Sequence, residues 1–139
     1  MAVVRSGFEV KSRGFTDVID ITGRVSDALS GSGLSDGIAL VFVAGSTASV
    51  TSIEYESGAV SDLKRAMEEM APEDGDYAHN ERWHDGNGFS HVRAALSGSG
   101  FSVPFSDGRL VLGTWQQIVL LDHDNRSRGR EVIVQMVGE

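Results

Sequence analysis

The chain has 139 residues, a formal net charge of −8 and no cysteine. This length is typical of one domain and suffices to bury a hydrophobic core, so we expect residues 1–139 to form a single domain. The lack of cysteine excludes disulfides, thiolate metal sites and cysteine nucleophiles. The acidic balance, with the basic residues mostly scattered, argues against a nucleic-acid partner.

The N-terminal residues lack the basic segment and apolar stretch of a signal peptide. No apolar run approaches the ~20 residues that a membrane-spanning helix needs. We therefore expect a cytoplasmic protein with no membrane partner.

Hydrophobic patterning predicts the elements of the first half of the chain. Ile21, Val25 and Leu29 share one helical stripe, and the helix is expected to end at Gly33. The apolar run at 38–44 is typical of a central, buried strand. The segments predicted to be strands in this half are 3–10, 14–21, 38–44 and 49–55.

In the second half, Val60, Leu63 and Met67 have helical spacing, with Ser57 as a possible N-cap. A polar stretch follows from 73 to 88, and Ser90 is a possible N-cap of a short helix. The remaining predicted segments are a helix at 90–96 and strands at 101–105, 110–112, 114–121 and 131–137. Their short connections favour antiparallel pairing, with the last two strands joined around a polar turn. We expect Trp115 to lie in the core.

Three of the four histidines, His79, His84 and His91, lie in one polar stretch. Imidazole and carboxylate ligands suit a divalent metal, either zinc or magnesium/manganese. The candidate carboxylates are Asp85, Glu54 and Glu56. These residues are candidates for catalysis or metal binding; the alternative is a surface loop whose histidines have no specific role.

Two further segments are candidates for binding phosphate. Ser46, Thr47 and Ser49 follow the buried strand, where hydroxyl and backbone N–H groups can hold an anion. Arg126 and Arg130 flank Arg128 in a charged turn and can contact phosphate in a bidentate manner. The alternatives are an ordinary turn for the first segment and a solvated hairpin tip for the second.

Together and in order, these motifs resemble the YjbQ family. The motifs are Ser-Thr-Ala-Ser at 46–49, Tyr-x-His at 77–79, Asp-Gly-Asn-Gly at 85–88, Ser-His-Val-Arg at 90–93 and Leu-Gly-Thr-Trp-Gln at 112–116. The resemblance runs from about Ser12 to Glu139.

The resemblance implies an α+β fold, a mostly antiparallel β-sheet sandwich with a few helices, and a homotrimer with sites between subunits. It implies thiamine-phosphate synthase activity, which condenses a pyrimidine pyrophosphate with a thiazole phosphate, or related metal-dependent chemistry on a phosphorylated small molecule. The alternative is a non-catalytic trimeric protein that binds a small ligand or phosphate.

By the same resemblance, His79, His91, Asp85 and Glu54 match family histidines and acids, and Arg130 matches a late family arginine. Ser46, Thr47 and Ser49 match a hydroxyl-rich turn. This sequence departs from the pattern at two positions, because many bacterial members have histidine in place of Gly45 and some relatives have histidine in place of Phe89.

Overall fold

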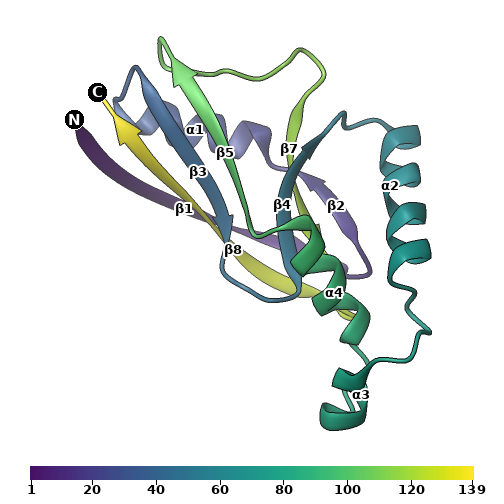
Figure 1. Cartoon of the computed structure of the whole chain (residues 1–139). Coiled ribbons are helices and arrows are strands. Elements are labelled where there is room, and N and C mark those ends of the chain that lie inside the picture. The colour runs from purple at the N-terminus through teal and green to yellow at the C-terminus, as the bar shows by residue number, and fades with distance from the viewer.

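The computed structural model describes all residues from 1 to 139 and contains two antiparallel sheets (Figure 1). The larger sheet has, in spatial order, β1 (Ala2–Ser12), β8 (Arg128–Gly138), β3 (Gly37–Val43), β5 (Gly100–Ser106) and β6 (Arg109–Leu110). The smaller sheet has β2 (Asp17–Asp20), β7 (Gln117–Asp122) and β4 (Ala48–Ile53). The predicted α+β class and the mostly antiparallel sheets are confirmed.

The main core lies between the two sheets. Val132, Val134 and Met136 alternate along β8 and are fully buried, as expected for a strand with one face on the core. Helix α1 (Thr22–Ser32) adds Val25 and Leu29 to the same cluster. The helix lies behind β3 and β5 in Figure 1. It ends at Gly33, which has a φ of 74° and is the predicted left-handed cap.

A second cluster lies on the outer face of the smaller sheet. Helix α2 (Ser57–Met70) places Met67 against Val119 and Leu121 of β7. Strand β7 is therefore covered on both faces, which explains why its residues from Ile118 to Asp122 are all buried. Figure 1 shows α2 standing outside this sheet, away from the larger one.

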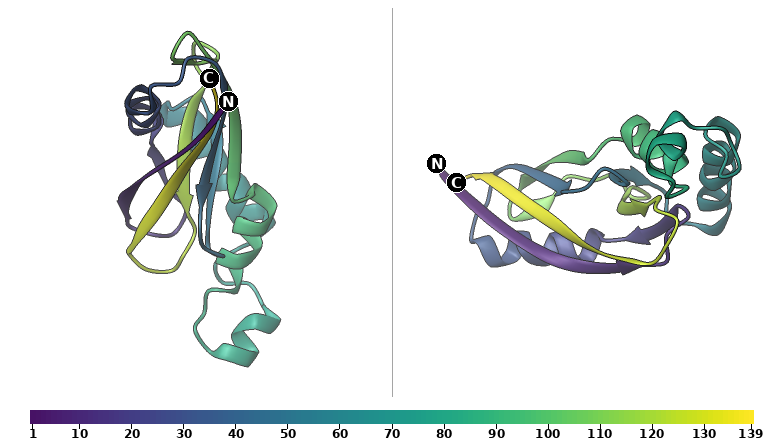
Figure 2. Two further views of the ribbon diagram at one scale, coloured as in Figure 1. Left: turned by 90° about the vertical axis from the view of Figure 1, so that its left-hand side faces the viewer. Right: turned by 90° about the horizontal axis from the view of Figure 1, so that it is seen from below.

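Two short helices lie at one end of the molecule, as both panels of Figure 2 also show. Helix α4 (Gly88–Ser97) packs against β4, and α3 (Ala78–Trp83) precedes it in the chain. The sequence predicted α4 but assigned α3 to a polar stretch. No helix is both long and apolar enough to cross a membrane.

The predicted pairing of the last two strands is wrong. Strand β7 pairs with β2 and β4 in the smaller sheet, whereas β8 pairs with β1 and β3 in the larger one. The polar segment between them therefore passes from one sheet to the other instead of forming a hairpin. Its first residues, Asp122, His123 and Asp124, are buried between the sheets.

Three smaller predictions also differ from the structure. Glu56, not Ser57, caps α2 by accepting hydrogen bonds from the backbone N–H groups of residues 58 and 59. Asn87 precedes α4, so Ser90 lies within its first turn and is buried. Trp115 is 71% exposed because it lies in the turn before β7 and not on a core-facing strand position.

Candidate functional site

The structure brings His79 and His91 together, although 12 positions separate them. His79 lies in the first turn of α3 and His91 in the first half of α4, and their ring centroids are 4.3 Å apart. His79 Nδ1 is 3.3 Å from Asp85 Oδ1. This nitrogen is buried and makes no hydrogen bond, so the carboxylate is near it but not aligned with it. Because protein atoms enclose this nitrogen, a ligand atom can use it only if neighbouring side chains move.

His91 is electrically neutral at neutral pH. Partial burial lowers its pKa below the ordinary value, and the adjacent His79 lowers it further. Asp85 and Asp124 act in the opposite direction but do not reverse the shift. A neutral imidazole can accept a proton or bind a metal ion, so His91 is chemically available at physiological pH.

A pocket of about 340 Å³ lies beside His91. It is enclosed by the loop that joins β3 to β4 and by one side of α4. Its lining residues are Gly45, Ser46, His91, Ala94, Ala95 and Ser99. The walls are small and mostly uncharged, so a compact ligand can approach the imidazole directly.

Behind this pocket, Arg130 and Asp122 form a buried ion pair whose side chains are 6% and 0% exposed. Arg130 donates from Nε to Asp122 Oδ2 at 2.8 Å and from Nη2 to Asp122 Oδ1 at 2.9 Å. Its Nη2 also donates to Thr47 Oγ1 at 2.6 Å. Burial acts to raise the pKa of Asp122, but hydrogen bonds from Arg130 and Ser12 hold that pKa below its usual value. The carboxylate is therefore ionised.

His123 lies in the same buried layer. Its Nδ1 is 2.8 Å from Thr16 Oγ1 and its Nε2 is 2.9 Å from Ser49 Oγ. Thr16 Oγ1 accepts from Arg93 Nη1, so its own proton is free to be donated to His123 Nδ1. Each ring nitrogen of His123 therefore has a hydroxyl partner. Burial, with Arg93 nearby, lowers the pKa of His123 to about 4.

Arg93 connects this layer to the surface of α2. Its side chain is 2% exposed and donates from Nη2 to Glu68 Oε2 at 2.6 Å. Nε donates to the backbone carbonyl of Ala71 at 2.9 Å, and the guanidinium carbon lies 4.9 Å from the ring centroid of Phe89. The ion pair therefore joins α4 to the end of α2 and supports the helix that carries His91.

Comparison with known proteins identifies the family. A sequence profile described as "UPF0047 protein YjbQ-like" matches residues 6–139. A UPF0047 protein of Methanothermobacter thermautotrophicus is 39% identical over 123 residues, which are 88% of this chain and 84% of the relative. The chain belongs to the YjbQ-like UPF0047 family.

Solved structures of family relatives have the same fold. A hypothetical protein from Aeropyrum pernix K1 superimposes with a TM-score of 0.91 at 32% identity, covering 98% of this chain and 99% of that chain. An uncharacterised YjbQ/UPF0047 protein from Clostridium acetobutylicum gives 0.86 at 34% identity, covering 95% and 99%.

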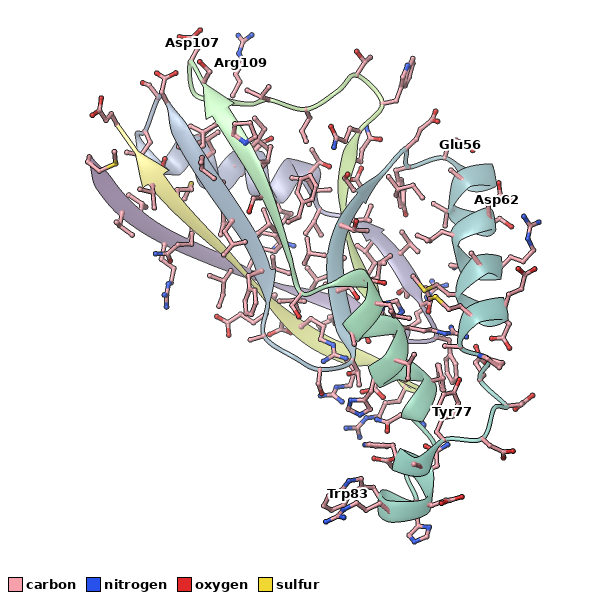
Figure 3. The ribbon with its side chains drawn as sticks, viewed as in Figure 1. Glu56, Asp62, Tyr77, Trp83, Asp107 and Arg109 are labelled. Carbon is pink, nitrogen blue, oxygen red and sulfur yellow. The ribbon has the colours of Figure 1, made fainter.

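Three of the histidine-site candidates, Glu54, Glu56 and His84, lie away from the pair. Glu54 follows β4 at the end opposite to Ser46, about 20 Å away for a strand of this length. Figure 3 places its neighbour Glu56 at the far end of α2 from Tyr77 and Trp83. His84 ends α3 in a left-handed conformation, with a φ of 58°, and lines a separate hollow with Tyr77.

The candidates for binding phosphate include both exposed and buried side chains. Ser46 is exposed and lines the pocket beside His91, whereas Thr47 and Ser49 are buried in hydrogen bonds to Arg130 and His123. Arg126 is exposed and lines a different hollow, together with Asp85. Only Ser46 among these hydroxyl groups is thus directly available to a ligand.

Sequence reasoning missed the buried layer formed by Thr16, Arg93, Asp122, His123 and Asp124. One signal was present for Arg93, which follows Phe89 at a spacing of four and therefore lies on the apolar stripe of α4. An arginine on a core-facing stripe needs a buried partner. The sequence did not show which acid would supply it.

Proposed function

We propose that this chain acts on a phosphorylated small molecule in the pocket beside His91. The chemistry we propose is that of a thiamine-phosphate synthase or a related transfer. The observation that carries the proposal is a neutral imidazole at the rim of a compact pocket, paired with a second imidazole at 4.3 Å.

In such a condensation the thiazole ring nitrogen, which carries no proton, forms a bond to the pyrimidine's methylene carbon. The bond from that carbon to a pyrophosphate oxygen breaks, and negative charge gathers on the leaving pyrophosphate. Hydrogen-bond donors aimed at that charge lower the barrier. Ser46 can donate its hydroxyl proton to a phosphate oxygen. His91, being neutral, can donate its N–H group to an oxygen of the leaving pyrophosphate or bind a metal ion that opposes its charge.

We also propose that the histidine pair binds a divalent cation, which would oppose the charge of a pyrophosphate group. No group of three or more histidine, aspartate or glutamate side chains is placed to hold a metal ion. His79 and His91 would therefore need further donors from the ligand, from water or from a second subunit. Zinc, magnesium and manganese are the ions to compare.

The His91→Ala variant tests the proposal. We expect it to lower the rate of pyrophosphate release from the two thiamine precursors by about 100-fold or more, the usual loss when a group that stabilises transition-state charge is removed. It should also lose the metal-induced rise in melting temperature. His84→Ala is the matched control, because His84 is exposed and outside the pocket, and it should retain both properties.

An unchanged rate and unchanged metal response in His91→Ala would overturn the proposal. Binding without any turnover in the unmodified protein would instead favour the alternative function, a non-catalytic ligand-binding protein. The lack of a complete group of metal ligands within one chain is the observation that favours this alternative.

We further propose that the chain forms a homotrimer through the outer face of the larger sheet. Val3, Val137 and Ile38 are paired across β1, β8 and β3, so they share one face, and they are 64%, 41% and 59% exposed. No helix covers this face where it turns toward the viewer in Figure 1. A row of exposed apolar side chains across three neighbouring strands favours association.

We expect Ile38→Glu to convert the trimer into monomers, because it places a charge within this apolar row. Sedimentation velocity measures the change directly. Met70→Glu is the control, since Met70 is 50% exposed on α2, away from the sheet. A monomeric unmodified protein, or a trimer that survives Ile38→Glu, would contradict the predicted interface.

A further inference from the structure

The Nη1 group of Arg130 is the one part of this guanidinium without a partner. Nε and Nη2 donate to Asp122 and Thr47, whereas Nη1 makes no hydrogen bond within the chain. The side chain is 6% exposed, so few positions exist from which another group can reach it. Nη1 is not among the buried side-chain atoms that lack a partner, so it is reached from solvent and an atom of a ligand can accept from it.

Gly45 lies directly beside this free group. A Cβ atom built on Gly45 would be 3.0 Å from Arg130 Nη1, and no other atom would come within 4 Å of it. The backbone at Gly45 does not have a positive φ, so its conformation does not require glycine. The space left by the missing side chain therefore borders the guanidinium and nothing else.

The same residue lines the pocket beside His91. Arg130 does not itself line that pocket, but the space beside the Cα of Gly45 borders its Nη1 group. Ser46, on the same loop, and His91, on the facing helix, complete the polar side of the pocket. An oxygen atom at this place would accept from Nη1 while the rest of the ligand faces the imidazole.

We infer that Gly45 is a specificity-determining residue that lets one oxygen of an anionic ligand group reach Arg130 Nη1. This inference rests on the proposed function, because it uses the same pocket. Asp122 already balances the charge of Arg130 and holds its other two edges. The guanidinium is therefore held in place before a ligand binds. It offers one donor group in a fixed direction, which suits a hydrogen bond to one phosphate oxygen.

Isothermal titration with inorganic pyrophosphate tests the inference. We expect Gly45→Ala to weaken pyrophosphate binding by about tenfold or more, the usual cost of losing a hydrogen bond to a charged group. Gly45→Ser should weaken binding to a similar degree, because its hydroxyl can accept from Nη1 in place of the ligand. We expect the Gly45→Ser variant to fold normally. It therefore keeps the inference testable if Gly45→Ala does not fold. Ala44→Ser, an exposed change in the same loop, should leave binding unchanged.

The outcomes separate this inference from the proposed function. Unchanged pyrophosphate affinity in folded Gly45→Ser would overturn the inference, even if His91→Ala abolishes turnover. Lost affinity in both Gly45 variants, with Ala44→Ser normal, would support it even if the unmodified protein shows no synthase activity. An unmodified protein that binds no pyrophosphate would overturn the role assigned to Gly45.

Discussion

Replacing Asp122 with alanine is expected to lower the free energy of unfolding by roughly 3–5 kcal/mol, because it leaves the charge of Arg130 buried and unpaired. The carboxylate is fully buried and accepts from both Nε and Nη2 of that arginine. For a domain of this size the loss corresponds to a fall of roughly 10–20 °C in melting temperature. Chemical denaturation monitored by circular dichroism measures it.

Asp62→Ala is the matched control for this prediction. Asp62 pairs with Arg65 on α2 at 3.4 Å, but both side chains are about 70% exposed. Exposed ion pairs contribute about 1 kcal/mol at most, so little change is expected. A loss below roughly 1 kcal/mol in Asp122→Ala would show that Arg130 finds another partner or is hydrated, contrary to its burial.

Acidification is expected to destabilise the protein between pH 6.5 and about pH 4, chiefly through His123. Burial lowers the pKa of this imidazole from 6.5 to about 4. In that window the unfolded chain binds a proton that the folded chain does not, so stability is complete above pH 6.5 and falls as pH decreases. The shift corresponds to a loss of roughly 3 kcal/mol by pH 4.

His123→Gln should remove most of this pH dependence, although it will lower stability at pH 7 by leaving a hydroxyl without its partner. His91 contributes in the same direction, because its pKa is also lowered. His84→Ala, which changes an exposed imidazole, should follow the curve of the unmodified protein. A stability that stays constant from pH 6.5 to pH 4.5 would contradict the neutral, buried state of His123.

Local patterns predicted most of the helices and strands, because the spacing of apolar side chains within a segment indicates which of the two it forms. The alternation in β1 and β8 and the helical stripe ended by Gly33 were all visible in the sequence. The second strand was predicted too long. Gly14, Phe15 and Thr16 all have positive φ, which confines β2 to Asp17–Asp20. Two consecutive non-glycine residues with this backbone leave no clear local signal.

The sheet to which each strand belongs could not be predicted in the same way. A short polar segment between two apolar strands indicates a hairpin, yet β7 and β8 lie in different sheets. The continuous apolar run of β7 was a sign that both of its faces are covered. What covers them, α2 on one side and the larger sheet on the other, depends on contacts between distant parts of the chain.

By itself, the sequence determined the family and the α+β class, because these follow from motifs and local periodicity. It also predicted a site at His79 and His91, whose rings lie together in the structure. Only the tertiary structure decided which polar groups are available to a ligand. Thr47 and Ser49 looked like ligand-binding groups, but Arg130 and His123 hold their hydroxyl groups in the protein interior. Of the Arg130 guanidinium, partners from other segments leave only Nη1 free. Burial and hydrogen-bond pairing arise from the meeting of distant segments, so no local pattern can reveal them.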